Sequence, residues 1–224
     1  GAEKAVAAFS GVQIEDVEYR PGPTEVRPDT EVLVLTEDKI RDKILENIKS
    51  AAEGDRIDLG MFYLAHREII NQLILAADRG VEVRIILDPN KDAFGFEKNG
   101  IPNRQAAAEF LEKSGGKIQV RWYLTHGEQY HTKIIGIHKK DETVLIGGSA
   151  NYTRRNLDNY NLEADLMVTV KPGDPLAEEF AAWFDRTWEN RDGIYTGDYS
   201  EYQDDSLWKK AVYRFQEKTG LCTF

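Results

Sequence analysis

Apolar and polar residues along this chain follow two periods, one typical of helices and one typical of strands. Between residues 38 and 52, apolar side chains recur every three or four positions, which predicts an amphipathic helix. Short runs rich in β-branched residues flank it, at 32–35 and 81–87, and both predict strands; the second has the continuous apolar character of a buried strand. Thr36 stands just before the helix and is predicted to cap it.

The same two periods alternate over most of the chain. Further strands are predicted at 56–62, 118–123, 133–137, 144–146 and 161–170. Further helices are predicted at 67–79, 104–114, 176–189 and 206–218. Strand–helix–strand alternation predicts an α/β/α sandwich on a mixed, partly parallel sheet. A long loop, 88–103, follows a buried strand at a position where ligands often bind in such folds.

Three stretches divide the chain. Residues 1–30 contain three prolines and little periodicity, which predicts an irregular lead-in. Residues 31–190 hold the alternating strands and helices and form the predicted domain. Residues 191–224 are an acidic, aromatic C-terminal extension with a final helix.

Composition narrows the class of protein. The 224 residues carry a formal net charge of −10, which argues against sequence-independent DNA binding and against passive docking on anionic lipid. No apolar run approaches the roughly 20 residues that span a bilayer. Cys222 is the one cysteine, so no intramolecular disulfide forms, and the redox compartment cannot be inferred.

The candidate chemistry begins at His131 and Lys133, which open the predicted strand at 133–137. Residues two apart on a strand face the same way, so the imidazole and the ammonium lie side by side. Ser149 and Asn151 follow the next strand, and antiparallel pairing brings them near this pair. Glu163 begins the strand after that. Each feature alone equally fits an exposed strand end, a turn or a solvated carboxylate; together they suit metal-free chemistry on a phosphodiester.

These residues resemble a known motif. The H-K-D motif of the phospholipase D superfamily is matched by His131, Lys133, Gly148, Ser149, Asn151 and Glu163. The resemblance extends over about residues 30–190. The segments 62–64, 76–81 and 85–88 resemble the usual entry to that repeat. The longer segments 88–95, 122–123, 125–129 and 153–156 resemble bacterial phospholipase D-like proteins related to cardiolipin synthases.

The resemblance implies a two-step transfer with a phosphohistidine intermediate, without metal or cofactor, and most often on phospholipids. His131 attacks phosphorus, and a second histidine protonates the leaving alkoxide. Lys133 and Asn151 stabilise the phosphoryl oxygens, Ser149 hydrogen-bonds near them, and Glu163 holds His131. His126 and Glu128 beside His131 also suit zinc, but no further Cys or His supplies a usual closed site.

One position departs from the family pattern, H-x-K-x4-D. His138 stands where the pattern has aspartate, and Asp141 follows three residues later in a predicted hairpin turn. His138 and Asp141 are therefore candidates for structural support of the motif. Asn90, Asn103 and Arg154 are further candidates for contact with a headgroup or phosphate, although a surface loop and a solvated arginine explain them equally well.

The family uses two motifs, and this chain has one. The second histidine comes either from a symmetric dimer or from the missing N-terminal half of a longer protein. The absence of an initial Met and the proline-containing lead-in favour the longer protein, which would be cytoplasmic or membrane-associated. Two other functions stay open, a nuclease of the same superfamily and an inactive half-domain that serves as an interaction module. The acidic balance speaks against the nuclease.

Overall fold

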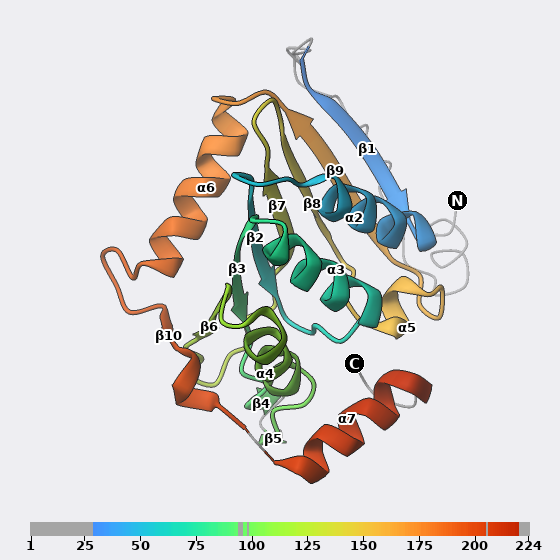
Figure 1. The fold of residues 1–224 in the computed structure, drawn as a ribbon, viewed down its shortest axis with the longest axis vertical. Helices are drawn as coiled ribbons and strands as arrows, with labels where there is room; N and C mark the ends of the chain where they lie inside the picture. Colours follow the sequence, from blue (N-terminus) through green and yellow to red (C-terminus); the bar gives the residue numbers. More distant parts are fainter. Residues whose placement is uncertain (1–28, 94–95, 98, 205, 220–224) are drawn as a thin grey trace, which may run out of the picture.

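Eight strands form one mixed sheet, in the order β1–β9–β8–β7–β2–β3–β6–β10 (Figure 1). This computed structural model describes residues 29–93, 96–97, 99–204 and 206–219, so most of the predicted lead-in lies outside it. The strands are β1 (Glu31–Thr36), β2 (Arg56–Met61), β3 (Glu82–Leu87), β6 (Ile118–Tyr123), β7 (Lys133–His138), β8 (Thr143–Gly148), β9 (Ala164–Val170) and β10 (Thr196–Asp198). β2, β3 and β6 run parallel, and every other pairing is antiparallel.

The remaining elements lie between these strands. The helices are α2 (Asp38–Ser50), α3 (Arg67–Asp78), α4 (Asn103–Ser114), α5 (Arg154–Leu157), α6 (Pro175–Trp188), α7 (Leu207–Thr219) and a 3-10 turn, η1 (Tyr199–Tyr202). The long loop after β3 contains two short strands that pair with each other, β4 (Asp92–Ala93) and β5 (Phe96–Glu97).

Helices cover both faces of the sheet, which confirms the predicted α/β/α sandwich. α2, α3 and α4 cover one face, where they pack on alternate residues of the central strands (Figure 1). α6 packs on the other face through Phe180 and Phe184, against Ile86 and Leu145. Gly136 on β7 allows this close approach, because a Cβ there would collide with the ring of Phe180. The aromatic side of α6 is therefore mainly core.

A buried ionic cluster lies between the sheet and α6. Asp58 on β2 is 0% exposed, and both of its carboxylate oxygens accept from Arg84 on β3, at 2.7 and 2.9 Å. Arg84 also donates to Asp185 of α6 at 2.8 Å. Burial raises the pKa of Asp58, but the partners His138, Arg84 and Arg56 outweigh burial and hold it below its usual value. The cluster therefore ties two parallel strands and α6 together through one charged group.

Two local predictions were wrong. Thr36 does not cap a helix, because it is the last residue of β1 and pairs with Ala164 of β9. Glu37, with a φ of 55°, stands at the start of α2 instead. Glu163 precedes β9 rather than beginning it, since that strand begins at Ala164.

Beyond residue 190, the extension adds elements that the sequence pattern did not predict. β10 pairs with Arg121–Tyr123 of β6 and so becomes the edge of the sheet. The η1 turn follows directly, and Trp122 donates its ring N–H to the carbonyl of Tyr199 at 2.8 Å. Three residues in a strand are too few for a periodic signal.

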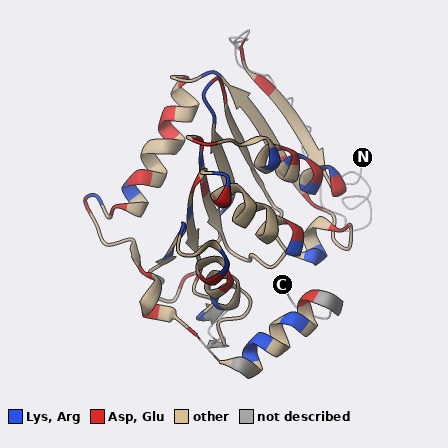
Figure 2. Cartoon of the chain, viewed as in Figure 1, with Lys and Arg blue, Asp and Glu red and all other residues tan. Residues whose placement is uncertain are grey.

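Positions occupied by basic and by acidic residues are mixed along the helices in Figure 2. α2 and α6 each carry acidic and basic residues. Within the part of the chain that the structure describes, none of the helices combines the length and the apolar character needed to cross a bilayer.

Candidate active site

The residues of the motif gather at one edge of the sheet, where β2 and β8 end and β7 and β9 begin. Lys133 opens β7 and pairs with Met61, the last residue of β2. Gly148 ends β8 and pairs with Asp165 of β9. The register of the β7–β8 hairpin, Ile134 with Gly147, places the segment after β8 beside the segment before β7, as predicted.

His131 and Lys133 lie against each other. The Nζ atom of Lys133 is 3.1 Å from Nδ1 of His131 and donates to the His131 carbonyl oxygen at 3.0 Å. The imidazole is exposed to solvent, whereas Lys133 is only 8% exposed. The ammonium thus lies beneath a solvent-facing imidazole, an arrangement that can offer a nucleophile and a cation to the same anionic group.

Both side chains titrate below their ordinary range. Partial burial lowers the pKa of His131, and the neighbouring Lys133 ammonium lowers it further. Burial also lowers the pKa of Lys133, against the opposing effect of Glu163 and Asp165. His131 is therefore neutral near pH 7, as a nitrogen nucleophile requires.

Ser149 and Glu163 form a second group at this edge. The Ser149 hydroxyl donates to one carboxylate oxygen of Glu163, and the amide of Asn156 donates to the other. The Ser149 oxygen also accepts from the backbone N–H of Ala164 at 3.0 Å. In this arrangement the Glu163 carboxylate is bound to Ser149 and Asn156, while Nδ1 of His131 faces Lys133.

Gly148 is required by the close packing of β8 on β9. A Cβ at this position would collide with the Ala164 carbonyl and would lie 2.5 Å from Oδ1 of Asp165. Asp165 is 2% exposed and accepts from the backbone N–H of Ala150 at 3.1 Å. Burial raises the pKa of Asp165 to about 6.

Asn151 is half-buried, and its Oδ1 atom is buried without a hydrogen-bond partner among the described residues. An unsatisfied buried amide oxygen is uncommon in proteins. The segment around Asn151 is held by its neighbour Tyr152, whose backbone carbonyl accepts from Ala65 at 2.7 Å and from His66 at 2.8 Å. Asn151 thus lies on a fixed backbone.

Asn90 and Asn103 lie beneath the site rather than facing it. Asn103 is 0% exposed, and its amide donates to the carbonyls of Phe62 and Asp88 at 2.7 and 2.8 Å. Asn90 is 1% exposed and donates to Phe62 at 3.2 Å. The amides of both side chains therefore bind backbone carbonyls.

The other weaker candidates lie apart from His131. His138 on β7 approaches Asp58 at 3.4 Å, so the position that carries aspartate in the family pattern faces a carboxylate from β2. Asp141 is exposed in the turn between β7 and β8. Arg154 on α5 approaches Asp158 at 3.7 Å and lines a separate hollow.

Three residues near the site were not singled out by sequence reasoning. The ring of Phe62 lies beside that of His131, with ring centroids 4.8 Å apart. Asn156 binds Glu163, and Asp165 supplies the buried carboxylate described above. Asp165 could have been found from the sequence, because an acidic residue at an inward-facing position of a strand is unusual. Phe62 lies 69 residues from His131, and Asn156 lies 7 residues from Glu163. No local sequence pattern predicts either contact.

A hollow of about 440 Å³ opens beside His131, toward α6. Its walls include Tyr123, Trp183, Tyr195 and Arg186. Among the residues that the structure describes, no three His, Cys, Asp or Glu side chains come together as a metal-binding group. Metal-free chemistry stays a prediction.

The chain belongs to the phospholipase D superfamily. The family model described as "Cardiolipin synthase, PLD-like domain" matches residues 44–188, which is most of the sandwich. That span contains the whole constellation from His131 to Glu163, so the predicted resemblance is confirmed. Members of this family are phosphodiesterases or phosphatidyltransferases. A search of curated proteins found no match.

Solved structures of this superfamily share the fold. Nuc from Salmonella typhimurium, a phospholipase D family member, is 24% identical over 72% of this chain and 95% of its own, with a TM-score of 0.55. NucT from Helicobacter pylori is 19% identical over 72% of this chain and 97% of its own, with a TM-score of 0.56. Phosphatidylserine synthase from Haemophilus influenzae is 15% identical over 88% of this chain but only 47% of its own, with a TM-score of 0.60.

Proposed function

We propose that this chain supplies one half of an active site that cleaves or transfers phospholipid phosphodiesters through a phosphohistidine. The observation that carries this proposal is the direct contact between His131 and Lys133, 3.1 Å apart at the edge of the sheet. The family description, cardiolipin synthase, supports a phospholipid substrate. The net charge of −10 and the mixing of acidic with basic residues disfavour binding to the phosphate backbone of a nucleic acid.

The first step begins when a phosphodiester enters. An anionic oxygen is a stronger acceptor than a neutral imidazole, so Lys133 moves from His131 to a non-bridging oxygen. Asn151 binds an equatorial oxygen in the same step. His131 then attacks phosphorus in line, so that an N–P bond forms as the P–O bond to the leaving group breaks.

The second step regenerates the enzyme. The second histidine, which gave its proton to the leaving alkoxide as the P–O bond broke in the first step, now takes a proton from water or an alcohol. The resulting oxygen nucleophile attacks phosphorus, and the N–P bond breaks. Water gives hydrolysis, and an alcohol gives phosphatidyl transfer.

The second histidine comes from another motif-bearing unit, either a second copy of this chain or another half of a longer protein. α6 packs on β3 and β8, and none of the other described helices lies over the part of this face that β1 and β9 form. Val32, Val34 and Leu166 are 56%, 72% and 50% exposed on this part, and Leu162, just before β9, is 88% exposed. This apolar strip lies beside Ser149 and Glu163. We assign it as the surface on which the second unit packs.

The test is turnover of bis(p-nitrophenyl) phosphate in the presence of EDTA, with His131→Ala as the matched control. We expect turnover that resists the chelator and is lost in His131→Ala, which keeps its melting temperature. Wild-type turnover in His131→Ala would refute the role of this residue. If the chain alone is inactive, adding a second H-K-D unit with an intact histidine must restore turnover; failure to do so would favour the interaction module.

The substrate class is tested separately, by comparing phosphatidylglycerol vesicles with single-stranded DNA at equal phosphodiester concentration. We expect faster cleavage of the lipid, because the hollow beside His131 is lined by aromatic side chains and carries little excess positive charge. Faster cleavage of DNA would favour the nuclease instead.

A further inference from the structure

The aromatic ring of Phe62, directly after β2, lies against both members of the catalytic pair. Its centroid is 4.8 Å from that of His131, with the two rings inclined at 53°. The Nζ atom of Lys133 is 5.3 Å from the same centroid. Phe62 is 6% exposed, so its ring fills the space under the imidazole rather than meeting solvent.

The backbone of Phe62 is fixed at both of its polar groups. Its N–H donates at 2.8 Å to the carbonyl of Thr132, the residue between His131 and Lys133. Its carbonyl accepts from Asn103 at 2.7 Å and from Asn90 at 3.2 Å. Two buried amides therefore hold the carbonyl of Phe62, and its N–H is bonded to the segment that carries the motif. The position of the ring is thus fixed relative to that segment.

A small apolar cluster links Phe62 to α7. Phe62 belongs to a small apolar cluster with Tyr63, Ala65, Ile101 and Tyr213, and Tyr213 comes from α7. Tyr213 is 2% exposed. The family model ends at residue 188, so this helix lies outside the matched span.

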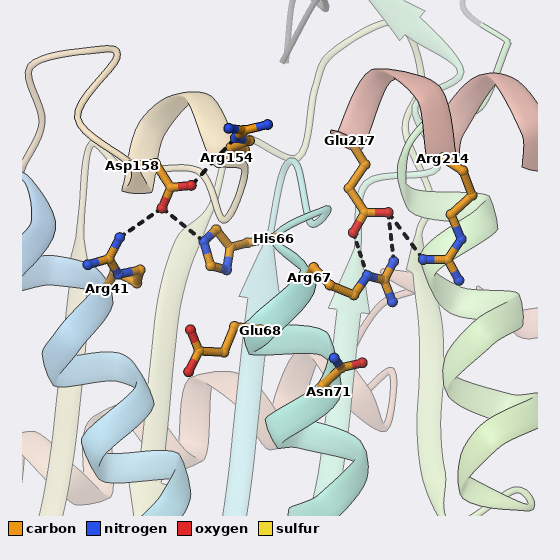
Figure 3. Close-up of a pocket in the computed structure, with 9 residues that line it drawn as sticks. All are labelled: Arg41, His66, Arg67, Glu68, Asn71, Arg154, Asp158, Arg214 and Glu217. Atoms are coloured by element: carbon orange, nitrogen blue, oxygen red, sulfur yellow. Dashed lines mark hydrogen bonds and ion pairs between the residues drawn. The ribbon is translucent and has the colours of Figure 1, made fainter. Parts of the chain in front are cut away.

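Ion pairs fasten α7 to the domain. Arg67, at the start of α3, donates to Glu217 at 2.9 Å, to the Tyr213 hydroxyl at 3.2 Å and to Glu109 at 2.6 Å. Arg214 of α7 pairs with Glu109 of α4 at 3.1 Å and, within α7 itself, with Glu217 at 3.2 Å (Figure 3). A hollow of about 770 Å³ separates this side of α7 from Arg41 and Asp158 (Figure 3). The helix is therefore held through Arg67, Arg214 and the Tyr213 cluster.

We propose that Phe62 is a positioning residue for His131 and Lys133, and that α7 holds Phe62 in place through the Tyr213 cluster. The role of Phe62 follows from its contacts, whereas its effect on turnover rests on the function proposed above. An aromatic face attracts an ammonium, so the ring keeps Lys133 under the imidazole. The same ring restricts rotation of the His131 side chain. This matters because the imidazole must approach phosphorus in line with the leaving group.

The deciding measurement is the titration of His131 in this chain by ¹⁵N NMR, because it does not depend on turnover. The variant is Phe62→Leu, which keeps apolar bulk and removes the aromatic face. The matched control is Phe110→Leu, a 0% exposed phenylalanine in the core under α4. The titration midpoint is compared rather than the chemical shift, since loss of a ring current alone moves the shift.

We expect the midpoint of His131 to rise in Phe62→Leu and to stay unchanged in Phe110→Leu. Without the ring, Lys133 leaves Nδ1 and water reaches the imidazole, so both causes of the lowered pKa weaken. The other charged groups that line the hollow beside His131, Glu128 and Arg186, are the same in all variants. An unchanged midpoint in Phe62→Leu would overturn the proposal.

The contribution of α7 is tested with Tyr213→Ala against Tyr213→Phe. The first removes the ring from the cluster, and the second removes only the hydroxyl that Arg67 binds. We expect Tyr213→Ala to raise the His131 midpoint and Tyr213→Phe to leave it near wild type. An unchanged His131 midpoint in Tyr213→Ala would show that α7 does not hold Phe62 in place.

Kinetics separate this inference from the proposed function. In an active assembly, Phe62→Leu should lower turnover about tenfold, or about 1.4 kcal/mol in barrier height, with little change in KM. Unchanged turnover there would also overturn the positioning role. If wild type has no turnover even with a second unit but the His131 midpoint still moves, the proposed function fails and the positioning role stands.

Discussion

The ammonium of Lys133 lies 3.1 Å from Nδ1 of His131 and also donates to the carbonyl of the same residue at 3.0 Å. This contact links the protonation of the imidazole to the position of the lysine. A bound phosphodiester would compete for the same ammonium. Substrate entry and activation of the nucleophile are therefore coupled in the proposed mechanism.

Replacing Lys133 with Met should reveal that coupling. Burial and the ammonium both lower the pKa of His131, so the acidic limb of the wild-type kcat/KM profile should lie below pH 6.5, the ordinary value for histidine. Lys133→Met removes the second cause, and the limb should move to higher pH. The variant also loses a cation at the phosphoryl oxygens, which should lower kcat about 100-fold or more. A profile with an unshifted acidic limb would contradict the coupling.

Asp165 should destabilise the fold near neutral pH. Its folded pKa of about 6 lies above the ordinary value of 3.8, so the folded state binds its proton more tightly than the unfolded state. This contribution to stability is present at acid pH and is lost as pH rises from about 4 to about 6.

Asp165→Asn keeps an acceptor for the Ala150 N–H and removes the charge. The variant should be about 2 kcal/mol more stable than wild type at pH 7.5, with little difference at pH 4, by urea unfolding. Equal stability of the two proteins at pH 7.5 would contradict the raised pKa.

Asp58 should be among the polar residues on which stability depends most. Asp58→Ala leaves Arg84 buried with only the partly exposed Asp185, at a cost of about 3 kcal/mol in the free energy of unfolding. Asp78→Ala is the matched control, because the Asp78–Lys117 pair has the same kind of contact at 2.8 Å but is exposed. The control should change stability by less than about 1 kcal/mol. Similar losses in both variants would show that burial does not set the strength of the cluster.

The apolar strip should govern association with the second motif-bearing unit. Val34→Glu combined with Leu166→Glu places two charges on this strip, where Val34 pairs with Leu166. Turnover by the assembly and co-sedimentation of its units should both be lost, while His131 titrates as in wild type. The control is Leu75→Glu, at a 48% exposed position on α3. Intact association in the double variant would place the interface elsewhere.

Much of the fold was predictable because its signals are local. The periodicities gave six of the sheet's strands to within two residues and every long helix, since a strand or helix that packs on a core must present an apolar face. β9 was predicted three residues too long at its start, because the strand begins at Ala164 and the side chain of the preceding Glu163 is bound by Ser149 and Asn156. β10 was missed, because its three residues are held by pairing with β6 rather than by any pattern of their own.

The sequence by itself determined the motif residues, the family and the layered architecture, since spacing along a strand decides which side chains face the same way. Only the tertiary structure decided what those residues touch. The buried Asn90 and Asn103 bind the carbonyl of Phe62, 28 and 41 residues away, and Tyr213 reaches the same cluster from α7. Glu163 is bound by Ser149 and Asn156, and His131 by Lys133. Hydrogen bonds and packing depend on distances in space, and a linear pattern records those distances only between close neighbours.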